Sequence, residues 1–298
     1  MHLVQRCLRR EFLALLMCLC AAGCSATVAD ANLLGVGSDN GDAGNSNGDA
    51  GGQGPMDAGS GSRTDGGPGG TDGGSGIIPS RCTLPTCSQS NNICTVSEGT
   101  NWDVYDNQWN CGAGSGETCG PETVYVCSGS SWYVVSDQPA GNTAVLSYVS
   151  TQVNYNSVPL SSFNSITSTF SEVSPHVGDY EAAYDVFFNP GNQWEVMVWV
   201  DNYNQTPGGG WNPIATNVSV GGSVYNVYQS GSTIYYVAVT NFTLGTVDLL
   251  AIFQDATNQR HWLPASVALE QIQFGWEICS TNGQNATFFL DEFSLTAN

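Results

Sequence analysis

Short runs of β-branched and aromatic residues dominate this chain from Cys82 onward. Clusters of Gly, Pro, Asn and Ser separate them, at the spacing of about ten residues that is typical of successive strands. The runs include TVYVC, WYVVS, AVLSYVS, EAAYDVFF, WEVMVWV, SVYNVYQ, TIYYVAVTNF, IQFGWEI and ATFFLDEF. This pattern predicts an all-β fold, a β-sandwich or jelly roll of two antiparallel sheets.

Two segments do not fit the strand pattern clearly. Residues 247–258 (VDLLAIFQDATN) are ambiguous between strand and helix, and residues 263–272 (LPASVALEQI) have room for a helical turn or two. We therefore expect at most one short helix.

The run WEVMVWV contains a glutamate among hydrophobic residues. Side chains on a strand alternate between its faces, which places Glu195, Met197 and Trp199 on one face. The other face is apolar and suits a core: Trp194, Val196, Val198 and Val200. An acid, a thioether and a flat aromatic ring in a row are suited to the floor of a sugar-binding cleft.

The segment QIQFGWEIC has the same alternation. Glu277 lies on the polar face, opposite Phe274 and Trp276, and Gly275 beside it is expected to leave room for a ligand. Two such strands of one curved sheet would present both glutamates to a concave cleft. One carboxylic acid and one carboxylate are the groups that glycoside hydrolysis needs.

A third carboxylate, Asp185, precedes Glu195 by one strand. If the two strands form a hairpin with odd residues facing odd residues, Asp185 shares a face with Glu195 and supports it. The alternative for all three acids is that they lie on the solvated face of a sandwich.

The first 80 residues differ from the rest in composition. In residues 1–24, three arginines precede the apolar run FLALLMCLCAAG, which is short for a membrane span and typical of a signal peptide. The small residues before Cys24 resemble a bacterial lipobox and predict lipidation of Cys24; the alternative is an ordinary signal peptide with Cys24 incidental. Residues 25–80 are rich in Gly, Asp, Ser and Asn and predict a disordered linker, which leaves 81–298 as the folded domain.

Charge and cysteine content narrow the class of protein. The net charge is −20 and the chain contains no lysine, so nucleic acid is excluded as a partner because phosphates need cations. Six cysteines lie between Cys82 and Cys127, which in an exported protein predicts disulfides; fifteen pairings are open. Cys279 is left over, as a buried free thiol.

Several of these segments together resemble the family 12 glycoside hydrolases, which are β-jelly-roll endoglucanases and xyloglucanases. The resemblance covers roughly residues 90–298 and rests on YDVFF at 184–188, WEVMVWV at 194–200, FGWE at 274–277 and VYDNQWN at 104–110. It implies that Glu195 is the nucleophile and Glu277 the general acid/base. It also implies that Trp109 stacks on a sugar ring and that Asn107 binds a hydroxyl group.

Two departures from the family pattern lie beside Glu277. Trp276 replaces a small residue, although alternation points it into the core, and Ile278-Cys279 replaces a Pro-Phe-like continuation. Family 11 xylanases carry Glu-Tyr-Tyr where this chain has Glu-Val-Met, which argues against xylan as the main substrate.

The expected protein is a retaining endo-β-1,4-glucanase that acts on cellulose-type, mixed-linkage or xyloglucan polysaccharides. It is expected to be a monomer without metal or cofactor, because carboxylates handle the charge of the reaction. It is exported, either extracellular or lipid-anchored at a bacterial cell surface. The alternative is a non-catalytic glucan-binding surface protein on the same fold.

Overall fold

A computed structural model describes residues 81–97, 101–112, 115–189, 193–208, 210 and 212–298. The predictions for residues 1–24, for Cys24 and for residues 25–80 lie outside this part. Within it, no helix has the length and apolar character that crossing a membrane requires.

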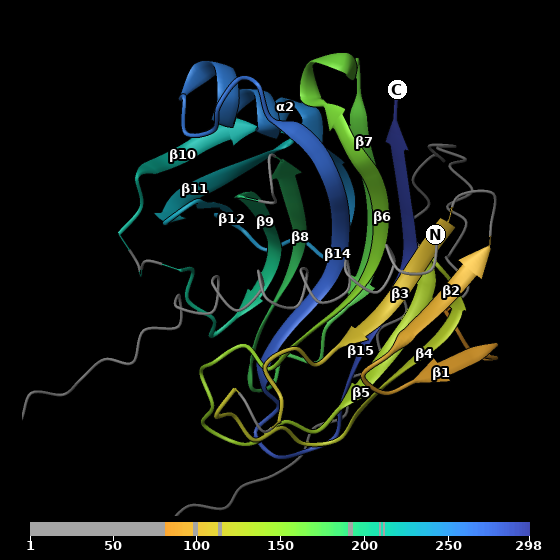
Figure 1. The fold of residues 1–298 in the computed structure, drawn as a ribbon. Coiled ribbons are helices and arrows are strands. Elements are labelled where there is room, and N and C mark those ends of the chain that lie inside the picture. Colours follow the sequence, from red (N-terminus) through yellow and green to blue (C-terminus); the bar gives the residue numbers. More distant parts are fainter. Residues whose placement is uncertain (1–80, 98–100, 113–114, 190–192, 209, 211) are drawn as a thin grey trace, which may run out of the picture. The chain divides into compact units, whose positions relative to one another are not determined.

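Two β-sheets make up the domain (Figure 1). The six-stranded sheet contains, in spatial order, β1 (Cys87–Gln89), β4 (Glu122–Ser128), β5 (Ser131–Ser136), β15 (Ala286–Ala297), β7 (Ile166–Val173) and β13 (Leu244–Asp248). The nine-stranded sheet contains β10 (Ala215–Val220), β11 (Ser223–Ser230), β12 (Thr233–Ala238), β9 (Trp194–Tyr203), β8 (Asp179–Asn189), β14 (Ala268–Ser280), β6 (Ser147–Pro159), β3 (Asn101–Asn107) and β2 (Ile93–Ser97). The predicted all-β jelly roll of two sheets is confirmed.

Neighbouring strands are antiparallel with one exception, the parallel pair β12 and β9. The long strands β6, β8 and β14 bend along their length, which gives the nine-stranded sheet a convex and a concave face (Figure 1). The six-stranded sheet covers the convex face, so the concave face is the one free to form a cleft.

The core between the sheets is aromatic. Trp276 and Phe274, which alternation assigned to the apolar face of β14, are fully buried there. The Trp276 ring meets Trp132 of β5 edge-on at 5.3 Å, and Phe274 stacks on Phe293 of β15 at 5.4 Å between centroids. Each buried ring of this size contributes about 2–3 kcal/mol through apolar burial. These contacts hold β14 firmly from behind and thereby position its other face.

The α-helix of the domain, α2 (Leu249–Gln254), falls in the first of the two ambiguous segments. Asp248 begins it by accepting a hydrogen bond from the Ala251 backbone N–H at 3.0 Å, an N-cap. A π-helical turn, η3 (Asp255–Gln259), follows, and a short 3₁₀ turn, η2 (Leu160–Ser162), lies between β6 and β7. The second ambiguous segment is not helical where it enters β14 at Ala268.

Three disulfides connect the six clustered cysteines: Cys82–Cys127, Cys87–Cys94 and Cys111–Cys119. The second of them ties β1 of one sheet to β2 of the other. Cys279 is buried and is in none of these disulfides, as the count of cysteines predicted.

Candidate active site

The concave face of β9 carries the three residues that alternation placed there. On this face Glu195 pairs with Thr233 of the parallel strand β12, and Met197 pairs with Tyr235. On the other side of β9, Met197 pairs with Asp185 of β8, so the predicted odd-to-odd hairpin register is confirmed. The valines that alternation assigned to the other face of β9 confirm it too, because they pack in the main core: Val196, Val198 and Val200.

A pocket lies on this face. Its empty space is ≈ 530 Å³, a volume that includes solvent at the opening. Its walls come from Trp109, Asn110, Ala144, Val145, Glu181, Glu195, Met197, Trp199, Gln205, Thr206, Gly208, Tyr235 and Glu277. Five of these residues were predicted for the site: Trp109, Glu195, Met197, Trp199 and Glu277. The glutamates are therefore not acids on an open, solvated face, because Glu195 is 7% exposed and still reaches the pocket.

Beside the carboxylates, the concave face carries a small apolar cluster of Ala183, Met197, Trp199, Tyr228, Tyr235 and Val237. The rings of Trp199 and Tyr235 meet edge-on at 6.0 Å between centroids. Flat aromatic faces next to acids suit a ligand whose surface alternates between apolar C–H faces and hydroxyl groups.

Two residues, Thr233 and Asp185, form hydrogen bonds with the carboxylate of Glu195. The Thr233 hydroxyl donates a hydrogen bond to Glu195 Oε2 at 2.7 Å. The carboxyl of Asp185 forms a second hydrogen bond with Glu195. Burial raises the pKa of Asp185 well above its usual range, and the charge of Glu195 and this hydrogen bond add to the rise. Asp185 is therefore the protonated donor, and Glu195 accepts from both partners.

Glu277 has a different environment. It pairs across the sheet with Tyr148 of β6 and with Glu181 of β8. Burial raises the pKa of Glu277 above its ordinary value, a hydrogen bond with Glu181 lowers it, and the charge of Glu195 raises it again. The net direction is upward, which keeps a proton on Glu277 at a higher pH than on an ordinary glutamate.

Tyr148 shows how closely the acids gather. Its hydroxyl donates to the Ala183 carbonyl at 3.1 Å, and its pKa is raised by burial first and then by the charges of Asp185, Glu277, Glu181 and Glu195. The arginines in the described part of the chain are Arg81 and Arg260, and each is paired elsewhere, with Asp291 and Asp255. The described residues therefore offer this cluster of acids no arginine to offset its charge.

Gly275 has a different role from the one we expected. A Cβ atom at this position would lie 1.9 Å from the Val149 carbonyl oxygen. The glycine is therefore required by the close approach of β6 to β14, and the expectation that it makes room for a ligand was wrong.

Asn107 is the last residue of β3, and Trp109 lies two residues after it. Trp109 lines the pocket, whereas Asn107 is buried in the strand, paired with Tyr148, and does not line it. Asn110 does, and its amide donates to the Val145 carbonyl at 2.8 Å. Asn110 belongs to the same VYDNQWN segment that pointed to Asn107, and it lies three positions further along the chain.

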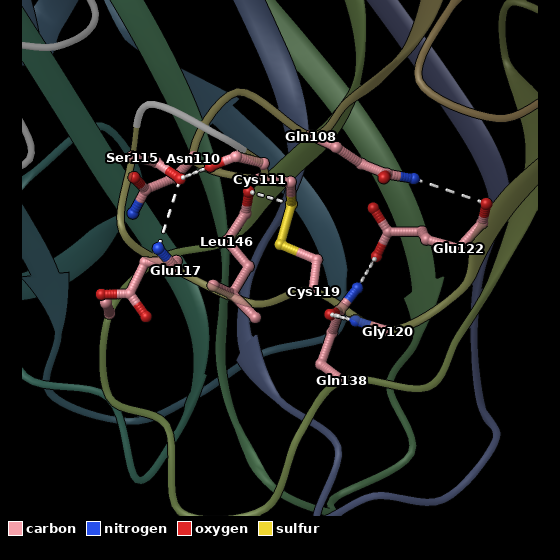
Figure 2. Close-up of a disulfide and its surroundings, with 12 residues drawn as sticks. Gln108, Asn110, Cys111, Ser115, Glu117, Cys119, Gly120, Glu122, Gln138 and Leu146 are labelled. Atoms are coloured by element: carbon pink, nitrogen blue, oxygen red, sulfur yellow. Dashed lines mark hydrogen bonds between the residues drawn. A yellow bond between two sulfur atoms is a disulfide. The ribbon is translucent and has the colours of Figure 1, made fainter.

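The Cys111–Cys119 disulfide begins two residues after Trp109. Figure 2 shows its surroundings. On one side of it gather Gln108, Glu122 and Gln138. Gln108 Nε2 donates to the Glu122 carbonyl at 3.4 Å, and the Asn110 backbone N–H donates to the Leu146 carbonyl at 3.3 Å. The disulfide-closed loop and these bonds fix the direction in which Trp109 leaves the strand.

Glu181, Gln205 and Tyr235 line the pocket but were not predicted for it. Glu181 lies four residues before Asp185 on the same strand face, so strand alternation would have found it. Tyr235 reaches the site through the parallel pairing of β12 with β9, for which the sequence has no local signal.

The chain resembles known glucan-degrading enzymes. The model of "Glycosyl hydrolase family 12" matches residues 100–298. "Endoglucanase S" of Pectobacterium parmentieri is 25% identical over 244 residues, covering 70% of this chain and 88% of that protein. "Endoglucanase A" of Aspergillus kawachii is 26% identical over 221 residues, covering 66% and 87%.

Solved structures give the same picture. The xyloglucanase domain of NopAA from Sinorhizobium fredii, in complex with cellobiose, has a TM-score of 0.62 and 26% identity, and covers 72% of this chain and 100% of that one. A family 12 xyloglucanase from Bacillus licheniformis has the same fold at 19% identity, with a TM-score of 0.60 and coverage of 71% and 99%. This chain belongs to glycosyl hydrolase family 12 and is a glycoside hydrolase.

Proposed function

We propose that this enzyme hydrolyses internal β-1,4-glucosidic bonds with retention of configuration, using Glu195 as the nucleophile and Glu277 as the general acid/base. The observation that carries the proposal is that both glutamates line one pocket while the charge of Glu195 contributes to the raised pKa of Glu277. One carboxylate that stays ionised beside one carboxylic acid that keeps its proton is the pair that retention requires.

In the first step, Glu195 attacks the anomeric carbon while Glu277 gives its proton to the departing glycosidic oxygen. In the second, Glu277 takes a proton from water, and that water releases the sugar from Glu195. Asp185 and Thr233 donate hydrogen bonds to Glu195. These bonds orient the carboxylate and stabilise the charge that returns to it when the sugar leaves.

The choice of β-1,4-glucan as substrate has two supports. Relatives with this fold are named endoglucanases and xyloglucanases, and one of the solved structures contains cellobiose. The pocket itself offers Trp109, Trp199 and Tyr235 as apolar faces.

Product stereochemistry tests the proposal. Purified enzyme is mixed with a soluble β-1,4-glucan such as mixed-linkage glucan or xyloglucan, and the anomeric protons of the first products are followed by NMR. Retention predicts β-anomers that later mutarotate, whereas α-anomers would contradict the role of Glu195. A wild type that binds glucan in an affinity gel without releasing reducing ends would support a non-catalytic glucan-binding protein instead.

We further propose that the enzyme is exported, with residues 1–24 as a signal peptide, Cys24 as a lipid anchor, 25–80 as a linker and 81–298 as a monomeric catalytic domain. Three disulfides suit an oxidising compartment outside the cytosol. Detergent phase partitioning tests the anchor. The full chain is expected in the detergent phase and Cys24→Ser in the aqueous phase, and equal partitioning of the two would rule the anchor out.

A further inference from the structure

Glu181 is a buried acid of the cleft for which the proposed mechanism has no role. It lies on β8, in register between Glu277 of β14 and Asn202 of β9. Its side chain is fully buried and yet forms part of the pocket wall. An acid in such a place is costly to ionise, because burial disfavours its charged form.

Glu181 and Glu277 are direct partners in the pairing of β8 with β14, so their side chains lie next to each other on the concave face. Two adjacent buried carboxyls are stabilised by a shared proton. Glu181 is fully buried and Glu277 is half-buried, so burial favours the proton on Glu181 as donor and makes Glu277 the acceptor. This proton is distinct from the one that Glu277 gives to the substrate.

The groups that face this pair favour a protonated Glu181. Acids come from β8 and β9 (Asp185 and Glu195), and Tyr148 of β6 is subject to the charges of all four acids. Cys279 of β14 accepts a hydrogen bond from Gln205 at 2.9 Å. The arginines of the described ranges, Arg81 and Arg260, are bound to other acids. With no cation beside it, Glu181 gains nothing from ionising.

We propose that Glu181 is a positioning residue whose protonated carboxyl donates a hydrogen bond to one oxygen of Glu277, which leaves the other oxygen of Glu277 to carry the catalytic proton toward the leaving group. The inference rests on the proposed role of Glu277. The working enzyme then holds two protons on this pair, one for orientation and one for transfer.

A pH dependence follows from this arrangement. When Glu181 loses its proton, the proton left on the pair is drawn into the bond between the two carboxyls and away from the leaving oxygen. Acid catalysis therefore stops at the pH where the pair loses its first proton, although Glu277 still shares the second. Glu181 sets the alkaline limit of activity.

Two substitutions separate this role from a structural one. Glu181→Gln keeps a donor at this position but cannot ionise, and Glu181→Ala removes the donor. We expect Glu181→Ala to lower kcat about 10- to 100-fold with little change in KM, the effect of losing a hydrogen bond to an ionisable group. Glu181→Gln is expected to recover most of that loss and to move the alkaline midpoint of kcat/KM on soluble mixed-linkage glucan upward by about one pH unit.

A matched control is Glu172→Gln. Glu172 is another buried carboxyl, on β7 of the six-stranded sheet, where Ser174 donates to it at 2.7 Å. Its replacement is expected to leave the alkaline midpoint where it is. If Glu181→Gln and Glu181→Ala lose activity equally, or if both keep the wild-type midpoint, Glu181 is only a packing residue and the proposal is overturned.

A readout besides activity distinguishes this proposal from the proposed function. Carboxyl ¹³C NMR is expected to show Glu277 titrating in two steps in wild type and in one step in Glu181→Gln. Identical titration curves overturn the Glu181 proposal. Failure of the wild type to cleave glucan, or near-normal cleavage by Glu277→Gln, contradicts the proposed function, and the NMR result then still decides whether Glu181 and Glu277 share their protons.

Discussion

Two groups of buried carboxyls lie in the domain, and their surroundings differ. The first joins Asp106 of β3, in the nine-stranded sheet, to Glu122 of β4, in the six-stranded sheet. The second is the set of four acids that acts on the phenol of Tyr148. Members of both groups have raised pKa values, chiefly through burial.

In the first group the protein supplies its own donors. Ser136 donates to Glu122 at 2.6 Å and Gln138 donates at 3.3 Å (Figure 2). Asp106 accepts from the Asn91 backbone N–H at 2.8 Å and from Gln108 at 3.2 Å. Burial, followed by the charge of Asp106, raises the pKa of Glu122 to about 8. Neither acid borders the pocket of the concave face.

In the second group three of the four acids open onto that pocket: Glu181, Glu195 and Glu277. A raised pKa is thus a property of burial and is shared by both groups. What distinguishes the second group, which we propose to be the reactive one, is an opening to a ligand and two carboxyls in different surroundings within it.

Removing an acid from each group gives the largest expected contrast. We expect Glu195→Gln to lower kcat at least about a thousandfold, because the proposed nucleophile is lost, and Glu277→Gln to lower it about 10²- to 10⁴-fold. Glu122→Gln is expected to keep kcat within about threefold of wild type. Initial rates on soluble glucan measure all three, and a Glu122→Gln variant that folds but loses activity as Glu195→Gln does would erase the contrast.

The next largest effect is expected on stability, from opening the loop that the Cys111–Cys119 disulfide closes. Replacing both Cys111 and Cys119 by serine frees a short loop, which is expected to cost about 2–3 kcal/mol of the free energy of unfolding. For a domain of this size that corresponds to a fall in Tm of about 5–10 °C by calorimetry. A variant with an unchanged Tm would show that the hydrogen bonds of Gln108 and Asn110 hold the loop without the disulfide.

Replacing Trp109 tests whether the pocket beside the second group of acids binds the sugar. Trp109→Ala removes an apolar face from the pocket, so we expect KM to rise about 5- to 30-fold, equivalent to about 1–2 kcal/mol, with a smaller change in kcat. Steady-state kinetics on mixed-linkage glucan measure it. A loss confined to kcat would mean that Trp109 positions the acids and does not bind the sugar.

The last comparison concerns the closed group, Asp106 and Glu122, and the pH dependence of stability. The pKa of Glu122 is about 8 in the folded chain, above the value of about 4.3 for an unfolded glutamate. Its stabilising contribution is therefore complete below about pH 4.3 and is lost as pH rises to about 8. Tm measured from pH 4.5 to 8 is expected to fall less steeply in Glu122→Gln than in wild type, and equal slopes would contradict the raised pKa.

The parts of the site that depend on local alternation were predictable. The period of two along a strand placed Glu195, Met197 and Trp199 on one face and Glu277 on another polar face. The hypothesis of a hairpin with odd residues facing odd residues placed Asp185 on the face of Glu195, and the observed register agrees with it. These inferences need only the residues of one strand or one hairpin.

The rest depends on contacts between segments far apart in the sequence. The parallel pairing of β12 with β9, which brings Thr233 to Glu195, has no local sequence signal. The pairing of Glu181 with Glu277 joins positions nearly a hundred residues apart, and six cysteines allow fifteen pairings, so spacing alone did not select the three that form. The close approach of β6 that explains Gly275 is a backbone contact of the same kind.

The central claim is that Glu195 forms a covalent bond with the sugar, and trapping that intermediate tests it most directly. An activated 2-deoxy-2-fluoro-β-cellobioside reacts with a nucleophilic carboxylate faster than the product is hydrolysed, so the adduct accumulates. Mass spectrometry of the digested enzyme is expected to place one fluorinated cellobiosyl group on the peptide that contains Glu195. A label on Glu277, Glu181 or Asp185, or no label on an enzyme that cleaves glucan, would contradict the account.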